Sequence, residues 1–202
     1  KNRNLLLERA LKSVLEQTYD NYDHVVVNDG GDEKTENICR NYSVKIINIV
    51  PNKGSYCARN EGLKESKGEF IGFVDADIKI NSNWLANAFH YIKRYDYVGG
   101  EIVMERAELN TITEAYEIYH SFPNDYLEKN SFLPTANLFV KRKVFEEIGG
   151  FNKRLRSSGD LEFGLRVKEN NFTQYFNKSI KVFHPPRGYK KYIKKIYRIT
   201  EG

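Results

Sequence analysis

A short apolar run at residues 70–74, followed at once by Asp75-Ala76-Asp77, constrains the fold of this chain more than any other stretch. Gly68 precedes the run and a polar stretch follows it. A continuous apolar run of this length is typical of a strand that is buried on both faces in the sheet of an α/β protein. Because ligands of open α/β sheets gather at the carboxyl ends of the strands, Asp75 and Asp77 are expected at a binding edge.

Two interpretations of Asp75 and Asp77 remain open from this stretch alone. Carboxylates one residue apart repel each other, and a hard divalent cation with oxygen ligands would relieve the repulsion. An isolated Asp-x-Asp is, however, more often a pair of solvated loop acids. The choice between a metal site and an exposed turn depends on the rest of the chain.

Short apolar runs alternate with amphipathic helical patterns through the first half of the chain. Strands are predicted at residues 24–28, 44–49 and 70–74, and helices at 4–17, after 31 as far as 42, after 54 as far as 63, and at 84–92. This order favours right-handed crossovers between parallel strands. The chain is therefore predicted to be an α/β protein with a mostly parallel central sheet flanked by helices. Trp84, on the apolar face of its helix, is predicted to lie in the core.

The start of the chain is unusual for such a sheet, because only Lys1, Asn2 and Arg3 precede the first helix. An α/β sheet of this kind normally begins with a strand. We therefore expect that the first strand is missing from this chain. One central position of the sheet would then be empty or filled by residues outside it.

The second half of the chain is less regular. Strands are predicted at residues 97–104, 136–140 and 180–183, helices at 111–120, 144–148 and 160–168, and a loop with two prolines at 121–134. Asp160 falls at or near the start of its helix, where the helix dipole favours an acid.

Residues 189–202 end the chain with a basic amphipathic pattern. Its apolar face consists of Tyr189, Tyr192, Ile193, Ile196 and Tyr197, and lysine and arginine fill the rest. Such a helix can lie on an anionic membrane surface, so peripheral membrane contact through residues 189–199 is one interpretation. A helix that packs on this domain, or on one beyond Gly202, is an equal alternative.

Composition limits the classes of partner and the location. The net charge of +5 and the isoelectric point of about 9.0 favour phosphate-bearing partners or an anionic membrane surface. No zinc-finger or aromatic-basic RNA-binding pattern is present, and no nucleic-acid partner is predicted. Cys39 and Cys57 lack a Cys-x-x-Cys spacing, and no apolar stretch approaches the ~18 residues that cross a bilayer. These features predict a cytoplasmic protein, with membrane association left open.

Six ordered blocks stand out along nearly the whole chain. They are Ala10-Leu11-x-Ser13-Val14-Leu15-x-Gln17-Thr18-Tyr19; Val25-Val26-Val27-Asn28-Asp29-Gly30; Asn52-Lys53-Gly54 with Ala58-Arg59-Asn60-x-Gly62-Leu63; Gly68-Glu69-Phe70-Ile71-x-Phe73-Val74-Asp75-Ala76-Asp77; Thr135-Ala136-Asn137-Leu138-Phe139-Val140; and Ser158-Gly159-Asp160-Leu161-Glu162. In this order and spacing they resemble the inverting family 2 nucleotide-sugar glycosyltransferases, which adopt the glycosyltransferase A fold. In that family the first strand comes just before a pair such as Asn2-Arg3, which supports the expectation of a missing strand.

The resemblance implies a nucleotide site and a metal site. Asp29 takes the position that faces the nucleotide base in relatives, and Arg59 and Asp75 would also lie at the nucleotide. Asp75 and Asp77 match the metal-binding block and would hold Mg²⁺ or Mn²⁺. His184 follows the base block, where a histidine of some relatives completes the metal shell or touches the diphosphate; a packed histidine is an equal alternative.

The resemblance also implies a catalytic base. Asp160 is the first choice, and Glu162 the reserve, for the carboxylate that takes the proton of the acceptor hydroxyl. The structural alternative for Asp160 is a plain helix N-cap. Asn137, Arg166 and Arg187 are candidates for acceptor or phosphate contacts, and their alternatives are a strand-edge hydrogen bond, a surface ion pair and an exposed arginine.

Three positions depart from the pattern of the family. Asn28 stands where relatives usually carry the first of two acids. Ile78 stands where many carry a third acid after the metal-binding pair, and Gly159 stands where the base block often has Glu.

Residues and resemblance together predict a cation-dependent inverting glycosyltransferase. It would move a sugar from a nucleotide diphosphate sugar, most often a uridine one in this family, to a saccharide or lipid-linked acceptor, in bacterial cell-envelope polysaccharide assembly. Residues 1–105 would form the nucleotide-binding half of a single domain, and residues 106–188 the acceptor-binding half. The first alternative is a non-catalytic nucleotide-sugar binding domain of a larger protein. The second, a nucleic-acid binding domain, rests on charge alone.

Overall fold

The computed structural model describes residues 2–105, 112–113, 115–116, 133–187 and 189–200. The helix predicted at residues 111–120 and the loop predicted at 121–134 lie largely outside these ranges.

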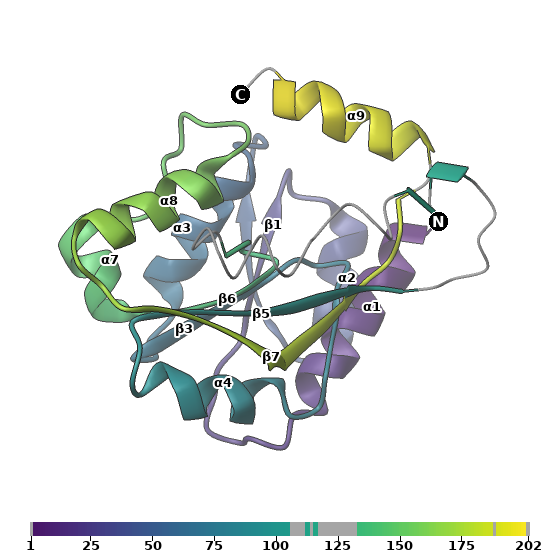
Figure 1. The fold of residues 1–202 in the computed structure, drawn as a ribbon. Coiled ribbons are helices and arrows are strands. Elements are labelled where there is room, and N and C mark those ends of the chain that lie inside the picture. The colour runs from purple at the N-terminus through teal and green to yellow at the C-terminus, as the bar shows by residue number, and fades with distance from the viewer. Residues whose placement is uncertain (1, 106–111, 114, 117–132, 188, 201–202) are drawn as a thin grey trace.

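The order of helices and strands follows the prediction (Figure 1). The helices are α1 (Asn2–Leu15), α2 (Glu33–Asn41), α3 (Ser55–Glu65), α4 (Trp84–Ile92), α7 (Arg142–Ile148), α8 (Gly159–Glu169) and α9 (Tyr189–Thr200). The strands are β1 (Val25–Asp29), β2 (Lys45–Ile49), β3 (Phe70–Val74), β4 (Lys79–Ile80), β5 (Tyr97–Met104), β6 (Asn137–Lys141) and β7 (Gln174–His184). The sequence does not predict the short strand β4, and it predicts only the end of β7.

Local sequence explains where several elements begin and end. β1 opens with three valines, whose β-branched side chains favour extended chain. Asp32 caps α2, because its carboxylate accepts a hydrogen bond of 3.0 Å from the Thr35 N–H. β3 ends at Val74, so both acids of the Asp75-Ala76-Asp77 sequence follow the strand, as predicted.

Strand pairing divides the described strands into two sheets. β1 pairs with β2 in parallel, and the second sheet has the order β3-β6-β5-β7-β4. In the second sheet only β5 and β7 run parallel, and the other three pairs are antiparallel. The predicted α/β class with flanking helices is confirmed, whereas the pairing is mixed rather than mostly parallel. A buried apolar strand such as β6 has the same sequence pattern in either direction, so the pattern does not reveal its direction.

Helices cover both faces of the five-stranded sheet (Figure 1). On the face of α7 and α8, the core includes Tyr97 and Phe163, which are fully buried. On the face of α4, the core includes Trp84 and Ile180. The predicted core position of Trp84 is confirmed: its side chain is 4% exposed, and its indole N–H donates a hydrogen bond of 2.8 Å to Asn137 Oδ1.

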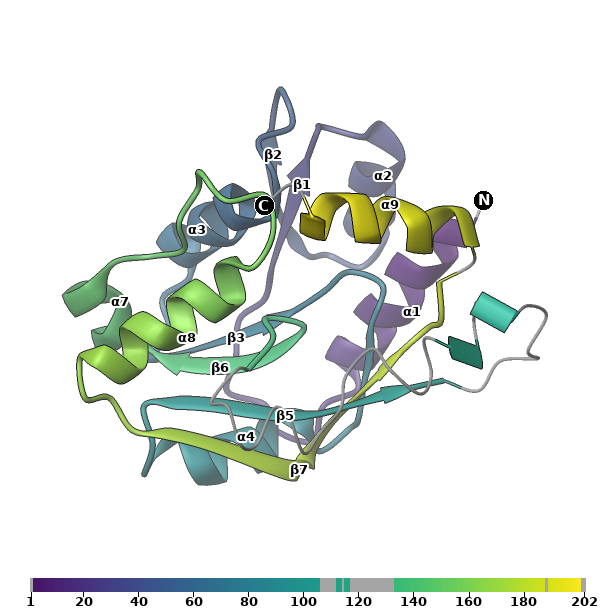
Figure 2. The ribbon, with the colours of Figure 1, turned by 45° about the horizontal axis from the view of Figure 1, so that its top comes forward.

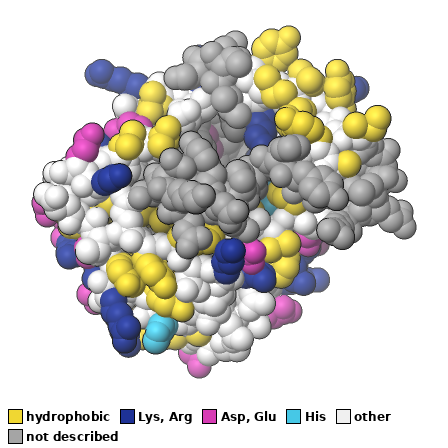
Figure 3. Space-filling view, in the orientation of Figure 1, with side chains coloured by type: hydrophobic (Ala, Val, Ile, Leu, Met, Phe, Trp, Pro, Cys, Tyr) yellow, Lys and Arg dark blue, Asp and Glu magenta, His cyan; other side chains and the backbone are white. Residues whose placement is uncertain are grey.

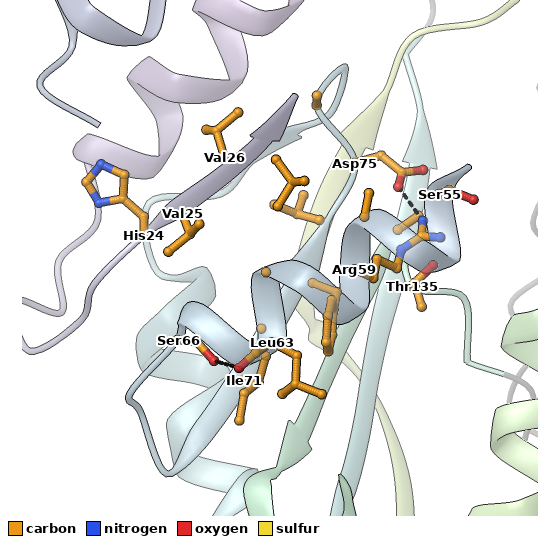
Figure 4. A pocket seen from close by; sticks show the side chains of 18 of the residues that line it. His24, Val25, Val26, Ser55, Arg59, Leu63, Ser66, Ile71, Asp75 and Thr135 are labelled. Atoms are coloured by element: carbon orange, nitrogen blue, oxygen red, sulfur yellow. Dashed lines mark hydrogen bonds and ion pairs between the residues drawn. The ribbon is translucent and has the colours of Figure 1, made fainter. Parts of the chain in front are cut away.

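A cavity of about 2840 Å³ lies between the two sheets. Apolar side chains from both sides line it, among them Val25 and Val26 of β1, Leu63 of α3 and Ile71 of β3 (Figure 4). β3 is the end strand of its sheet, and β1 pairs only with β2 among the described strands.

Candidate functional site

Polar side chains gather where strands of both sheets end. Asp29 ends β1, Asp75 and Asp77 follow β3, Arg59 lies on α3, and Asp160 lies in the first turn of α8. All five line the cavity between the sheets. The fold therefore brings together residues that are separated by up to 131 positions in the sequence (160 − 29).

An ion pair joins α3 to the end of β3. Arg59 Nη2 lies 2.8 Å from Asp75 Oδ1, and Figure 4 shows the two side chains pointing toward each other at one end of the cavity. Only 17% of the Arg59 side chain is exposed, and its guanidinium carbon lies 5.6 Å from the centroid of the Tyr56 ring. The ring and the carboxylate hold a planar cation at the cavity wall, where it can meet an anionic ligand.

Asp29 binds the loop that leads into α3. Its two carboxylate oxygens accept hydrogen bonds of 2.7 Å from the N–H groups of Lys53 and Gly54. Its carbonyl oxygen accepts a third, of 2.9 Å, from the Asn52 side chain. A carboxylate has about four acceptor positions, so each oxygen retains one for a ligand. Asp29 thus fixes the start of the helix that carries Arg59.

The loop after β3 is anchored at both of its ends. The Ile78 N–H donates to the Asp75 carbonyl at 3.1 Å, and the Ile78 side chain is 1% exposed within the core. Ile78 therefore holds the turn in place, at the position where many relatives carry a third acid. On the other side, Arg9 of α1 donates to the Asp77 carbonyl at 3.3 Å and pairs with Glu105 at 2.6 Å.

Sequence reasoning missed Arg9. Its two partners lie 68 and 96 residues away in the chain. Arg9 occupies the polar side of an ordinary amphipathic helix, so no local signal distinguishes it from a surface residue. The structure shows it as the residue of α1 that supports the loop between Asp75 and Asp77.

Asp160 presents one bonded and one unbonded oxygen. Its Oδ2 accepts hydrogen bonds from the N–H of Thr135 at 3.1 Å and from its hydroxyl at 3.0 Å. Its Oδ1 is buried and has no hydrogen-bond partner among the described residues. Burial raises the pKa of Asp160, and the negative charge of Asp75 adds to this, while Arg59 and Thr135 act in the opposite direction. A carboxylate with a raised pKa is a stronger base than an exposed one.

The start of α8 fits closely against α3. The Gly159 N–H donates a hydrogen bond of 2.8 Å to the Tyr56 hydroxyl oxygen. A Cβ atom at position 159 would lie 2.5 Å from Cζ of the Tyr56 ring, so a side chain does not fit there. Ser158, just before it, has a left-handed backbone (φ 59°). Gly159, which departs from the family pattern, is therefore required by the neighbouring tyrosine, and the contact sets the position of Asp160.

Glu162, the reserve choice for the base, is held by an arginine. Arg166 donates to both Glu162 oxygens, at 2.5 and 3.1 Å. The same guanidinium donates to the carbonyls of Ile148 and Gly150, at 2.6 and 2.7 Å. Neither Glu162 nor Arg166 lines the cavity. Together they connect α8 to the end of α7, so we do not carry them into the proposed site.

Asn137 lies in the core rather than at the site. Its side chain is fully buried, and its amide nitrogen donates to the carbonyls of Glu101 and Ile180 at 3.0 and 2.9 Å. With the Trp84 indole as donor to its oxygen, the amide uses both of its groups on internal partners. A ligand contact for Asn137 is therefore not proposed.

His184 is also fully buried. Its Nδ1 lies 2.6 Å from the Pro185 carbonyl, and its Nε2 lies 2.8 Å from Arg187 Nη2. Burial lowers the pKa of His184, and the charge of Arg187 lowers it further. Because a guanidinium can only donate, Nε2 is the acceptor from Arg187. In this arrangement Nε2 is directed at Arg187 rather than at a metal, and Arg187 itself lines the cavity.

The donor set at the end of β3 suits a hard cation. The described residues contain no cluster of three or more His, Cys, Asp or Glu side chains that could hold a metal. Mg²⁺ commonly takes only one or two carboxylates from a protein and completes its shell with water and phosphate oxygens. Asp77 has no hydrogen bond to its carboxylate from any described residue, and Asp75 is bonded there only to Arg59. Two carboxylates fit an ion of this kind when a diphosphate supplies the remaining ligands.

Comparison with protein-family models gives a match over most of this chain. The family model described as glycosyl transferase family 2 matches residues 1–151. The glycosyltransferase AglE of Haloferax volcanii is 29% identical over 206 residues, an alignment that covers 97% of this chain and 68% of AglE. An uncharacterized glycosyltransferase of Rickettsia felis is 28% identical, and there the chain spans only 33% of the relative.

Solved structures with this fold include two complexes with nucleotide sugars. TarS of S. aureus, residues 1–349 with UDP-GlcNAc, superimposes with a TM-score of 0.71 at 21% identity, over 90% of this chain and 55% of that one. The mannosyltransferase PcManGT of Pyrobaculum calidifontis, with GDP-Man and Mn²⁺, gives a TM-score of 0.73 at 19% identity, over 93% and 56%. At these identities the likeness establishes the fold.

Proposed function

The chain belongs to glycosyl transferase family 2, and from that premise we propose that it transfers a sugar from a nucleoside diphosphate sugar to an acceptor hydroxyl, with inversion at the anomeric carbon. The observation that carries the proposal is the position of Asp160. A buried carboxylate with a raised pKa and one unbonded oxygen lies in the same cavity as Arg59, Asp75 and Asp77.

The donor would bind along the ends of β1 and β3. Asp29 and the loop that it fixes would face the nucleotide base, and Arg59 and Asp75 would lie at the nucleotide. The solved structures include TarS in complex with UDP-GlcNAc and PcManGT in complex with GDP-Man and Mn²⁺. We propose a uridine diphosphate sugar as the first candidate for this chain.

Asp75 and Asp77 would hold Mg²⁺ or Mn²⁺. The ion would supply positive charge next to the diphosphate as the leaving group gains negative charge. Arg187, at the cavity wall, would add a cation from the protein itself. Arg9 would keep the loop in place through the Asp77 carbonyl.

Asp160 would act as the general base. The acceptor oxygen forms a bond to the anomeric carbon while the bond from that carbon to the diphosphate oxygen breaks, and the hydroxyl proton passes to Asp160 Oδ1. Thr135 holds Oδ2 and so leaves the other oxygen for the proton. A positioned base of this kind contributes about 10²- to 10⁴-fold to a rate. The acceptor would be a saccharide or a lipid-linked sugar, and a cell-envelope setting stays a prediction.

Asp160→Asn tests the proposal, with Glu162→Gln two residues further along α8 as the matched control. Uridine diphosphate with Mn²⁺ should raise the melting temperature of both variants by as much as that of the wild type. Turnover of a panel of nucleotide sugars should fall at least about 100-fold in Asp160→Asn and much less in Glu162→Gln. Unchanged turnover in Asp160→Asn would place the base elsewhere. A wild type that binds nucleotide sugars but turns none over would favour a non-catalytic binding domain.

A further inference from the structure

The apolar face of α9 is largely exposed. Tyr189, Ile196 and Tyr197 are 63%, 40% and 65% exposed, whereas Tyr192 and Ile193 on the same face are half-buried. A helix that served only to pack on this domain would bury these side chains. Figure 1 shows α9 at the upper edge of the molecule, and in Figures 1 and 2 one end of α9 lies near the amino-terminal end of α1.

A second segment adds apolar surface beside α9. Ile112 is 91% exposed and Tyr116 is 51% exposed. The Tyr116 ring contacts the ring of Tyr192 edge to face, with 5.9 Å between centroids, so the segment and the helix lie together. We call Ile112, Tyr116, Tyr189, Ile196 and Tyr197 the apolar patch.

The apolar patch is unusual for a protein surface. Its members are five of the ten large hydrophobic side chains that are exposed among the described residues. Hydrophobic atoms gather over α9 at the upper right of Figure 3. Contiguous exposed apolar surface commonly marks a docking site, whereas single exposed side chains do not.

The positive charge around the apolar patch favours an anionic partner. Residues 189–200 contain four lysines and one arginine and no acid. Lys190 and Lys194 are exposed. A second copy of this chain would bring the same positive charge to the interface, which opposes self-association through the patch. An anionic lipid surface offers both opposite charge and an apolar layer, and aromatic residues favour that boundary.

We propose that α9, together with Ile112 and Tyr116, docks this protein on the surface of an anionic lipid bilayer. No helix among the described residues is long and apolar enough to cross a membrane. Arg187, Lys194 and Lys195 also line the cavity of the candidate site. Docking would therefore bring that cavity next to the membrane. The docking itself does not depend on glycosyl transfer, so the two proposals can fail separately.

Vesicle sedimentation tests the proposal. The purified protein is mixed with vesicles of phosphatidylcholine alone, or of phosphatidylcholine and phosphatidylglycerol in equal parts. Binding should occur with the anionic vesicles and weaken as salt is added, because charge attraction is screened. Absence of binding to the anionic vesicles, or equal binding to both kinds, would overturn the proposal.

Paired variants separate the patch from general surface properties. Ile196→Ser with Tyr197→Ser should weaken binding roughly tenfold or more, since two large apolar contacts are lost. Leu5→Ser with Leu15→Ser is the matched control, because these α1 side chains are 64% and 44% exposed outside the patch. The control should bind like the wild type, and circular dichroism should show that all variants keep their helices.

Charge is tested in the same way. Lys190→Gln with Lys194→Gln should weaken binding about 30-fold, since each lysine near an anionic surface contributes roughly a fivefold factor. Lys12→Gln with Lys34→Gln removes the same charge from exposed positions on α1 and α2 and should have little effect. Equal losses of vesicle binding in the two double variants would show that binding depends on net charge alone, and would refute a local site at α9. The alternative outcome is self-association of the protein without vesicles. If Ile196→Ser with Tyr197→Ser abolished that self-association, the apolar patch would be an interface with a second copy of the chain.

Discussion

Thr135→Val isolates the effect of one hydrogen bond on the proposed base. The substitution keeps the shape of a side chain that is 1% exposed and removes the hydroxyl that donates to Asp160 Oδ2 at 3.0 Å. The backbone N–H of residue 135 continues to donate at 3.1 Å. The change therefore acts on the ionised form of Asp160 with little disturbance of the fold.

The magnitude follows from that single contact. A hydrogen bond to a charged group contributes about 1.5–3 kcal/mol, and about 1.4 kcal/mol corresponds to a factor of ten. Loss of the hydroxyl should raise the pKa of Asp160 further. Where the base is mostly protonated, its ionised fraction should fall about 10- to 100-fold.

The assay is the pH profile of kcat/KM, which reports the ionisation of the free enzyme. In Thr135→Val the acidic limb should move to higher pH, while the rate at alkaline pH stays close to that of the wild type. Thr135→Ser, which retains a hydroxyl, should restore the original profile. An equal loss of rate at every pH would refute the reasoning, because it would show that Thr135 acts on something other than the ionisation of Asp160.

Three further perturbations have defined outcomes. Because burial raises the pKa of Asp160, the stability that this side chain contributes is complete below its unfolded pKa and is lost as pH rises through its folded pKa. Calorimetry should therefore show a higher Tm for Asp160→Asn than for the wild type at neutral pH. The difference in Tm should disappear on acidification. Arg166→Ala leaves two carbonyls and Glu162 without their donor, so urea unfolding should show a loss of about 1–3 kcal/mol, more than for Glu162→Gln. Arg9→Ala frees the Asp77 carbonyl, and the Mn²⁺ concentration needed for the thermal shift by uridine diphosphate should rise several-fold, with partial recovery in Arg9→Lys.

Much of the fold follows from patterns that are local in the sequence. The run that becomes β3 is short, apolar and followed by two acids, so both the strand and the acidic turn after it can be predicted from the sequence. β5 has the predicted bounds, because burial is nearly continuous along it. The direction of strand pairing is a different matter. β6 lies between β3 and β5, and it pairs with residues too far away in the chain for a local sequence pattern to reveal.

The same distinction between local patterns and long-range contacts applies to the residues of the candidate site. Asp29, Asp75 and Asp160 stand in motifs at the ends of strands or at the start of a helix, and Arg59 stands in a motif within α3, so the sequence marks all four as candidates. The roles of other polar residues depend on long-range contacts. Asn137 is a motif residue whose partners fully bury it, and those contacts emerge only on folding.

The contact between Tyr56 and Gly159 couples the residue types that two positions 103 residues apart can accept. With the tyrosine present, any β-carbon at position 159 meets the ring at 2.5 Å. A residue other than glycine at 159 therefore requires a different residue at 56, or a shift of the Tyr56 ring or of the start of α8. An alignment of relatives should show these two columns changing together.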